Sequence, residues 1–154
     1  MPQVTKKVSV RAPFDLVWEI AQNVEEFPSI MPELDKVEVL EKSQTSPHTT
    51  RTVTQWTARI PQFGRTIEWT EEDIWNREEG NCHFWQIKGD FTEYKGLWKF
   101  RQNGDETEVD LAIDYAFEIP LVGALMKKVM QKLMQGNADM MADALKAEAE
   151  KQAG

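Results

Sequence analysis

The sequence predicts a single α+β domain in which a curved antiparallel sheet of about seven strands wraps around a long C-terminal helix. The last third of the chain, from Leu121 to about Glu150, carries apolar residues at three- and four-residue steps, which is typical of one amphipathic helix. Alternating segments joined by short turns fill most of the chain before it, as in an antiparallel sheet with one wet face. Two short helical segments follow the first strand, and neither a linker nor a repeat divides residues 1–154.

The first elements of the chain are short. Residues 4–10 alternate as a strand, and a helix is expected to begin at Ala12-Pro13-Phe14-Asp15. Proline is favoured early in a helix, and an acidic side chain in the first turn interacts well with the helix dipole. A second short helix is expected around residues 24–30, where Pro28 and Pro32 end it.

Turn signals rich in proline, glycine and asparagine separate the remaining strands. Asn103-Gly104-Asp105 is one such signal. One strand begins at residues 37–40, and further strands are expected at about 48–59, 65–76, 81–89, 92–102 and 107–118. In the last of these, one face is apolar and the other carries acidic residues. The apolar face consists of Val109, Leu111, Ile113, Tyr115 and Phe117.

Composition and charge exclude several classes of function. A net charge of −8 argues against a nucleic-acid partner and against stable insertion into anionic membranes. Without a membrane-length apolar run or a segment of signal-peptide type at the N-terminus, we expect a cytoplasmic protein. Cys82 is the only cysteine, and His48 and His83 lack the spacing of metal ligands, so we expect no metal and no cofactor.

Methionine dominates the apolar stripe of the C-terminal helix, which holds five of the seven methionines. The flexible and polarizable thioether suits a surface that must fit more than one shape. The stripe therefore favours a helix that closes over a cavity, with Met126, Met130 and Met134 facing it; the alternative is a core helix that is merely rich in methionine. Asn137 interrupts the stripe and could reach a ligand or bond to neighbouring backbone.

Tryptophan is the other abundant large residue, and five of the six lie on predicted strands. Each offers a wide apolar face and one N–H donor, so a curved sheet of such residues could enclose an aromatic or isoprenoid molecule. The alternative is that these side chains simply fill the core. The predicted lining from the sheet is Trp56, Trp69, Trp75, Trp85, Trp98 and Tyr115.

Two carboxylates share the phase of apolar residues in the strand at 65–76. If Trp69 and Trp75 face inward, period-two geometry turns Glu71 and Asp73 inward as well. Buried carboxyl groups are costly unless they are protonated, hydrogen-bonded or solvated. The pair could orient a ligand hydroxyl or act as acid and base. Alternatively, a bulge or a place at a wet cavity mouth would expose both groups to solvent.

The stretch Val-Ser-Val-Arg-Ala-Pro-Phe-Asp-Leu-Val-Trp-Glu at 8–19, followed by Val-Glu-Glu-Phe-Pro at 24–28, resembles the opening of the START-like helix-grip superfamily, SRPBCC. The chain is most similar to its polyketide cyclase/dehydrase and coenzyme Q-binding branch, whose later strands residues 89–100 and 114–120 resemble. The resemblance implies a seven-stranded sheet that grips the helix around a deep apolar cavity for a lipid, quinone or polyketide. It also implies that the cavity mouth is bordered by Phe27, Ile30, Met31 and Phe63.

The resemblance leaves three functions open. Aromatase/cyclases of the family carry a catalytic arginine after a Gly-Arg-x-x-Glu-Trp-like segment; this chain has such a segment at 64–69 but Asp73 at the arginine position. A tyrosine expected after the second short helix falls near Leu34. We therefore expect reversible binding of a hydrophobic small molecule. The alternatives are a polyketide cyclase or dehydratase that uses Glu71 and Asp73, and a toxin-like module that binds a protein partner.

Overall fold

A seven-stranded antiparallel sheet and one long helix form the fold, as the sequence predicts. The computed structural model describes residues 2–61, 64–117 and 123–154, with the side chains of 123–126 left out. The strand order is β1-β7-β6-β5-β4-β3-β2. In chain order the elements are β1 (Gln3–Val10), α1 (Phe14–Gln22), the 3₁₀ helix η1 (Val24–Ser29), β2 (Leu34–Ser46), β3 (Thr49–Ile60), β4 (Arg65–Asn76), β5 (Asn81–Gly89), β6 (Glu93–Asn103), β7 (Glu106–Ala116) and α2 (Gly123–Ala153).

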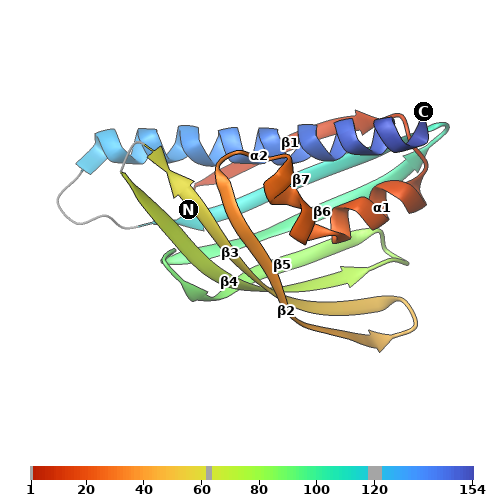
Figure 1. Cartoon of the computed structure of the whole chain (residues 1–154), viewed down its shortest axis with the longest axis horizontal. Helices are drawn as coiled ribbons and strands as arrows, with labels where there is room; N and C mark the ends of the chain where they lie inside the picture. Colours follow the sequence, from red (N-terminus) through yellow and green to blue (C-terminus); the bar gives the residue numbers. More distant parts are fainter. Residues whose placement is uncertain (1, 62–63, 118–122) are drawn as a thin grey trace.

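Consecutive hairpins build the sheet from β2 to β7, and β1 then pairs with β7 from the other end of the chain. Val8 lies opposite Val109 in that pairing. The helices α1 and η1 carry the chain from β1, at one edge of the sheet, to β2, at the other. The helix α2 lies across the concave side, with α1 beside its C-terminal end (Figure 1).

Alternation of apolar residues fixes which face of each strand is buried. In β7, every second residue from Thr107 to Tyr115 is buried, as its apolar phase predicts. The strand β2 is longer than predicted: it begins at Leu34 and continues to Ser46, and its second half is exposed. That half is mostly polar, so it shows no apolar alternation from which a strand could be predicted. Register shifts along β2 bend it away from the core.

Polar contacts hold α2 along β1. The Gln135 side chain donates from Nε2 to the Thr5 carbonyl at 2.9 Å, and Lys146 donates from Nζ to the Ser9 carbonyl at 2.6 Å. These contacts fix the rotation of the helix about its axis. As a result, α2 turns one fully buried stripe toward the sheet, formed by Ala138, Ala142, Leu145 and Ala149, which we call the packing stripe.

An aromatic cluster fills the end of the core beside α1. The Trp18 ring meets Trp75 edge-on, with ring centroids 5.4 Å apart, and meets Phe100 at 5.3 Å. Trp98 stacks on Phe100 with ring centroids 5.8 Å apart. Such edge-on and offset contacts are the preferred geometries of packed aromatic rings. This end of the core is filled by side chains.

Candidate functional site

An apolar cavity lies between the sheet and α2, at the end of the core away from α1. Its volume, taken as the space open to the centre of a water-sized molecule, is about 40 Å³. One water needs roughly 10–15 Å³ on that measure, so a larger ligand requires the lining to move apart. The residues that line it are Met31, Glu33, Leu34, Trp56, Ala58, Ile67, Trp69, Phe91, Tyr94, Ile113, Met134, Asn137 and Met141.

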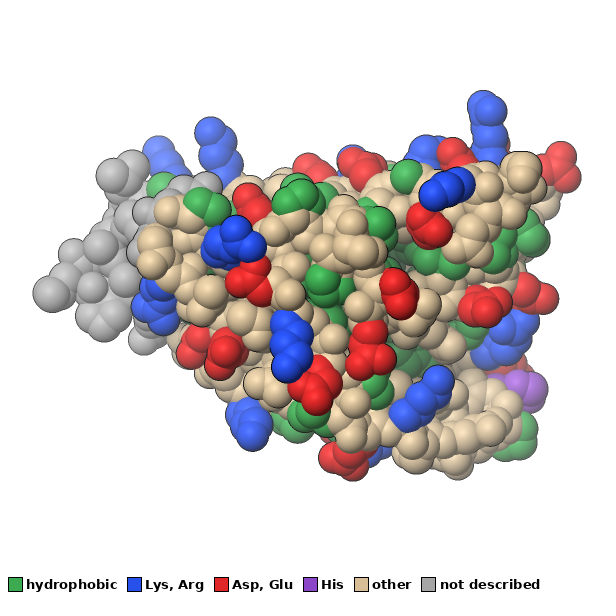
Figure 2. All heavy atoms as spheres, viewed as in Figure 1, with side chains coloured by type: hydrophobic (Ala, Val, Ile, Leu, Met, Phe, Trp, Pro, Cys, Tyr) green, Lys and Arg blue, Asp and Glu red, His purple; other side chains and the backbone are tan. Residues whose placement is uncertain are grey.

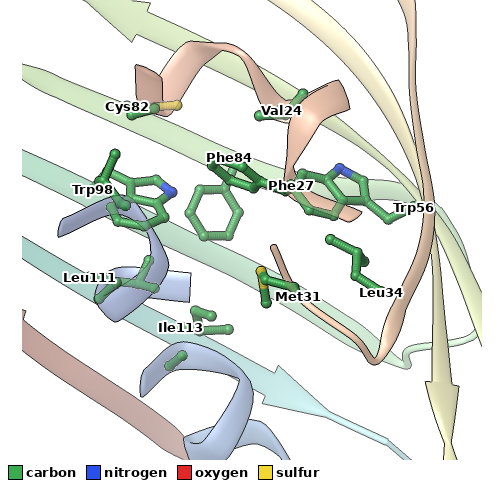
Figure 3. Close-up of a cluster of buried hydrophobic side chains, with 14 of the residues drawn as sticks. Val24, Phe27, Met31, Leu34, Trp56, Cys82, Phe84, Trp98, Leu111 and Ile113 are labelled. Carbon is green, nitrogen blue, oxygen red and sulfur yellow. The ribbon is translucent and has the colours of Figure 1, made fainter. Parts of the chain in front are cut away.

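The sheet side of the cavity is built on a stacked pair of indoles. Trp56 and Trp69 are direct cross-strand partners in β3 and β4, and their rings are nearly parallel, at 7°, with centroids 5.8 Å apart. Phe27 packs against Trp56, with Met31 and Leu34 close by (Figure 3). Phe91 meets Trp69 edge-on with ring centroids 5.4 Å apart. Together these rings form a wall of flat aromatic faces on the sheet side, which we call the indole wall after Trp56 and Trp69.

Hydrogen bonds hold both indoles in place. The Trp56 Nε1–H donates to Thr54 Oγ1 at 2.8 Å, and the Trp69 Nε1–H donates to Glu71 Oε1 at 2.8 Å. Because both N–H groups are satisfied below the wall, the ring faces presented to the cavity are apolar. Opposite them, α2 contributes a second stripe next to the packing stripe: Met134, Asn137 and Met141, which we call the cavity stripe.

Glu71 and Asp73 lie on the inner face of β4 and are 4% and 5% exposed. Asp73 Oδ2 accepts hydrogen bonds from Thr52 Oγ1 at 3.0 Å and Thr54 Oγ1 at 2.9 Å. The two carboxyl groups lie within hydrogen-bonding reach of each other, so they can share a proton. We call these two residues the carboxyl pair. Neither is part of the cavity lining; they lie beneath the indole wall.

The shared proton resides on Glu71. Burial, followed by the negative charge of Asp73, raises the pKa of Glu71 well above its usual value. Burial also raises the pKa of Asp73, but hydrogen bonds from Glu71, Thr54 and Thr52 oppose that rise by stabilising the carboxylate. These directions favour a proton on Glu71 and a carboxylate on Asp73, so the pair can both donate and accept a proton.

The bulge that the sequence left open as an alternative, which would expose the pair, is not in β4. The pairing of β4 with β3 is unbroken from Asn76 to Arg65. The register shift between β4 and β5 skips Ile87, so the extra residue lies in β5. Alternation along β4 is therefore preserved through Glu71 and Asp73.

The predicted cavity and mouth residues other than Trp85 separate into four groups. Trp56, Trp69, Met134 and Asn137 line the cavity, as does Met31 from the predicted mouth. Buried residues outside the described lining form the second group: Trp75, Trp98, Met130 and Tyr115, whose hydroxyl bonds Gln131 at 2.9 Å. Phe27 and Ile30 are the third group: Phe27 packs behind Trp56, and both border a separate shallow hollow between η1 and the end of α2. The fourth group, Phe63 and the side chain of Met126, lies outside the described residues.

The prediction that Trp85 lines the cavity is wrong. Cys82 and Phe84 occupy the inner face of β5, so strict alternation places Trp85 on the convex face, where it is 36% exposed. Tyr94 and Phe91 are lining residues that the prediction missed. Tyr94 lies four residues before Trp98 in β6 and so shares its inward phase, a signal that was present in the sequence.

The charge carried by the described lining of the cavity is acidic. Glu33 is the only charged lining residue, and no lysine or arginine lines the described cavity. On the outer surface, by contrast, acidic and basic side chains are interspersed over the viewed face (Figure 2).

Among the described residues, no group of three or more His, Cys, Asp or Glu could hold a metal ion. No described helix is long and apolar enough to cross a bilayer.

Comparisons with family models, curated proteins and solved structures all find similarity over most of the chain. The family model described as polyketide cyclase / dehydrase and lipid transport matches residues 10–142. A Streptomyces cyaneus protein named "Putative polyketide cyclase" is 25% identical over 114 residues, which are 73% of this chain and 71% of that protein. A crystal structure of a Thermus thermophilus protein superposes with a TM-score of 0.88 and 29% identity, covering 99% of this chain and all of the other. The Zhui aromatase/cyclase of Streptomyces sp. R1128 has the same fold, with a TM-score of 0.86, 21% identity and coverage of 99% and 96%.

Proposed function

The chain belongs to the polyketide cyclase/dehydrase and lipid transport family, and from this we propose that it reversibly binds a hydrophobic small molecule between the sheet and α2. The candidate ligands are a lipid, a quinone or a polyketide-like molecule. The single observation that supports this most strongly is the stacked pair Trp56 and Trp69 facing the methionines of the cavity stripe across an apolar space.

The two walls make different contributions to binding. The indoles are held by hydrogen bonds and by each other, so they offer a preformed flat surface for a ring system or an isoprenoid chain. Met134 and Met141 have several rotatable bonds, so they can move aside and then pack around the ligand. This division fits a cavity that is small when empty.

A filling substitution tests the location of the ligand. In Met134→Trp, the larger side chain occupies the cavity, so we expect affinity for the neutral probe 2-acetylnaphthalene to fall at least about 10-fold while the fold survives with a cost of about 1–3 kcal/mol. The matched control is Met140→Trp, since Met140 lies on the same helix outside the lining. Isothermal titration gives the affinity and urea unfolding gives the stability. Equal affinities in the wild type and both variants would place the ligand elsewhere.

A second candidate, a cyclase or dehydratase, would use the carboxyl pair, which a substrate could reach only if the indole wall moved aside, since neither carboxyl group lines the cavity. Protonated Glu71 could protonate a leaving hydroxyl while the Asp73 carboxylate removes a proton from the neighbouring carbon, so that water leaves and a C=C bond forms. The β-hydroxyketone 4-hydroxy-4-phenylbutan-2-one is a suitable probe, because its dehydration product absorbs in the ultraviolet. If the pair is catalytic, Glu71→Gln should slow turnover roughly 100-fold or more with nearly unchanged affinity. Absence of turnover in the wild type would leave binding as the function.

A further inference from the structure

The Tyr94 side chain presents a hydrogen-bond donor to an otherwise apolar cavity. Its ring is held between Phe91, Trp69 and Phe84, with centroid distances of 4.7, 5.3 and 5.8 Å. The residue is only 7% exposed, yet its hydroxyl makes no hydrogen bond to any described residue. Of the two tyrosines in the chain, Tyr115 instead has its hydroxyl bonded to Gln131.

The hydroxyl of Tyr94 belongs to a residue that lines the cavity. Among the described residues, no side-chain nitrogen or oxygen that is fully enclosed lacks a hydrogen-bond partner. The Tyr94 hydroxyl has no partner among those residues, which fits a group that is open to the cavity space. A buried donor without a partner carries a free-energy cost that a ligand oxygen would remove.

A second polar group faces the same space from the helix. Asn137 lies in the cavity stripe of α2, and its amide makes no hydrogen bond to a described residue. The cavity is thus apolar over most of its lining, with one polar side chain from the sheet and one from α2. Such convergent polar groups in an apolar pocket orient a ligand that has its own polar atoms.

Charge restricts which polar atoms fit. The carboxyl pair lies beneath the indole wall, and Glu33 belongs to the lining, so the charged groups among the described lining residues and directly beneath that wall are acidic. Burial, followed by the negative charge of the carboxyl pair, raises the pKa of Tyr94 well above its usual value, which means that an anion at this hydroxyl is disfavoured. A ligand carboxylate or phosphate at the same position would meet the same two penalties.

A cationic ligand fits the geometry less well than an uncharged one. The acceptor oxygens of the carboxyl pair are already bonded by Thr52, Thr54 and Trp69, and they are not part of the lining. An ammonium group would lose its water shell without gaining a direct carboxylate partner there. An uncharged acceptor oxygen needs only the donor that Tyr94 offers.

We propose that the cavity selects an uncharged hydrophobic ligand whose carbonyl oxygen accepts a hydrogen bond from Tyr94, and that the carboxyl pair excludes ligands ending in a carboxylate or phosphate. This proposal rests on the proposed binding function and names the ligand class for that same cavity. Tyr94 is then a specificity-determining residue, and the pair beneath the indoles acts through its charge.

Three probes of similar shape test the proposal by isothermal titration at pH 7.5: the ketone 2-acetylnaphthalene, the hydrocarbon 2-isopropylnaphthalene and the anion 2-naphthoate. For the wild type we expect the ketone to bind about 3- to 10-fold more tightly than the hydrocarbon, the range of one net hydrogen bond. We expect 2-naphthoate to bind at least about 10-fold more weakly than the ketone, because its charge is repelled and desolvated.

Two variants assign the effects to residues. Tyr94→Phe should abolish the preference for the ketone while leaving hydrocarbon affinity within about twofold, and Tyr115→Phe, the matched control, should keep the preference. Asp73→Asn removes the charge of the pair and should narrow the gap between ketone and naphthoate. If Asp73→Asn does not fold, the wild-type probe series and Tyr94→Phe still decide the proposal.

The possible failures can be told apart. If naphthoate binds as tightly as the ketone, or if Tyr94→Phe retains the ketone preference, the proposed selectivity is overturned while hydrophobic binding stands. If none of the three probes binds, the binding function is overturned together with the selectivity that depends on it.

Discussion

The indole N–H of Trp69 donates to the carboxyl group of Glu71, two residues further along β4, at 2.8 Å. This bond joins the cavity wall to the carboxyl pair, because Trp69 also stacks on Trp56 and Glu71 bonds Asp73. Alternation along one strand thus places a ligand-facing ring and a proton-holding group side by side.

Replacing Trp69 should therefore affect more than packing. We expect Trp69→Phe to lower the free energy of unfolding by about 1–3 kcal/mol, because it removes the donor to Glu71 and part of the stack on Trp56. Urea unfolding measures the loss. Trp85→Phe is the control, since Trp85 lies half-exposed on the convex face, and it should cost less than about 0.5 kcal/mol. Similar losses in the two variants would contradict the role of the bond.

Glu71 should make the stability of the protein fall as pH rises. Its pKa is raised in the folded state, so its stabilising contribution is complete below the unfolded value of 4.5 and is lost as pH rises through the folded pKa. Each pH unit between the two pKa values is worth about 1.4 kcal/mol. The amide of Glu71→Gln does not titrate, can still donate to Asp73 and can still accept from Trp69.

We therefore expect Glu71→Gln to flatten the decline in stability between pH 5 and pH 8, measured by urea unfolding. Some decline remains, because the pKa of Asp73 is also raised, and Tyr94, Cys82 and Glu72 are the other titratable groups close to the pair. Glu68→Gln, on the exposed face of the same strand, should follow the wild type. Parallel pH profiles for all three proteins would argue against a buried protonated Glu71.

Gly96 is required by its neighbours in the sheet. A Cβ atom at this position would lie 2.6 Å from the Ala112 carbonyl oxygen and closer still to the Phe84 ring. We expect Gly96→Ala to destabilise the protein by about 1–3 kcal/mol, because Phe84 must leave its place over β6. The same substitution at Gly136 in α2 meets open space and should instead stabilise the helix by up to about 1 kcal/mol. Thermal unfolding that shows the same direction for both would refute this assignment.

Ligand binding should slow hydrogen exchange in residues 24–34. Met31 and Leu34 line the cavity, while the backbone from Phe27 to Leu34 is held by local bonds such as Met31 N–H to the Phe27 carbonyl. We expect 2-acetylnaphthalene to protect this segment in exchange mass spectrometry. The strand β7, paired on both sides, should exchange slowly with or without the probe. Protection that persists in Met134→Trp would show that the effect does not come from the cavity.

Periodicity was enough to predict most of the fold. The buried phase of β7 and the inward direction of Glu71 and Asp73 follow from period two, and α2 follows from its apolar steps. The side chains that bound the cavity were harder to predict. Trp75 and Trp98 face inward as expected but pack with Trp18 and Phe100, because α1 covers that end of the sheet. Pattern alone shows that a side chain is buried but not which neighbours fill the space around it.

Two features depended on three-dimensional detail. The bulge at Ile87 lets β4 keep its alternation from Asn76 to Arg65 while the register of β5 shifts beyond Gln86, and nothing in the local composition marks it. In α2, the alanines of the packing stripe are fully buried while the described methionines keep some exposure, so the predicted methionine stripe is rotated relative to the packing stripe. The rotation is set by polar contacts to β1, such as Gln135 to Thr5, which a periodicity argument does not include.

The two adjacent stripes of α2 have different roles: the residues of the packing stripe stabilise the fold, and those of the cavity stripe would contact a ligand. The alanines of the packing stripe are fully buried, so a larger side chain would not fit there, and this limits substitution at these positions whatever molecule is bound. Met134 and Met141 border open space and can be exchanged for other apolar residues at small cost to folding. After gene duplication, ligand specificity could therefore change through a few substitutions in the cavity stripe, while the packing stripe and the fold stay the same.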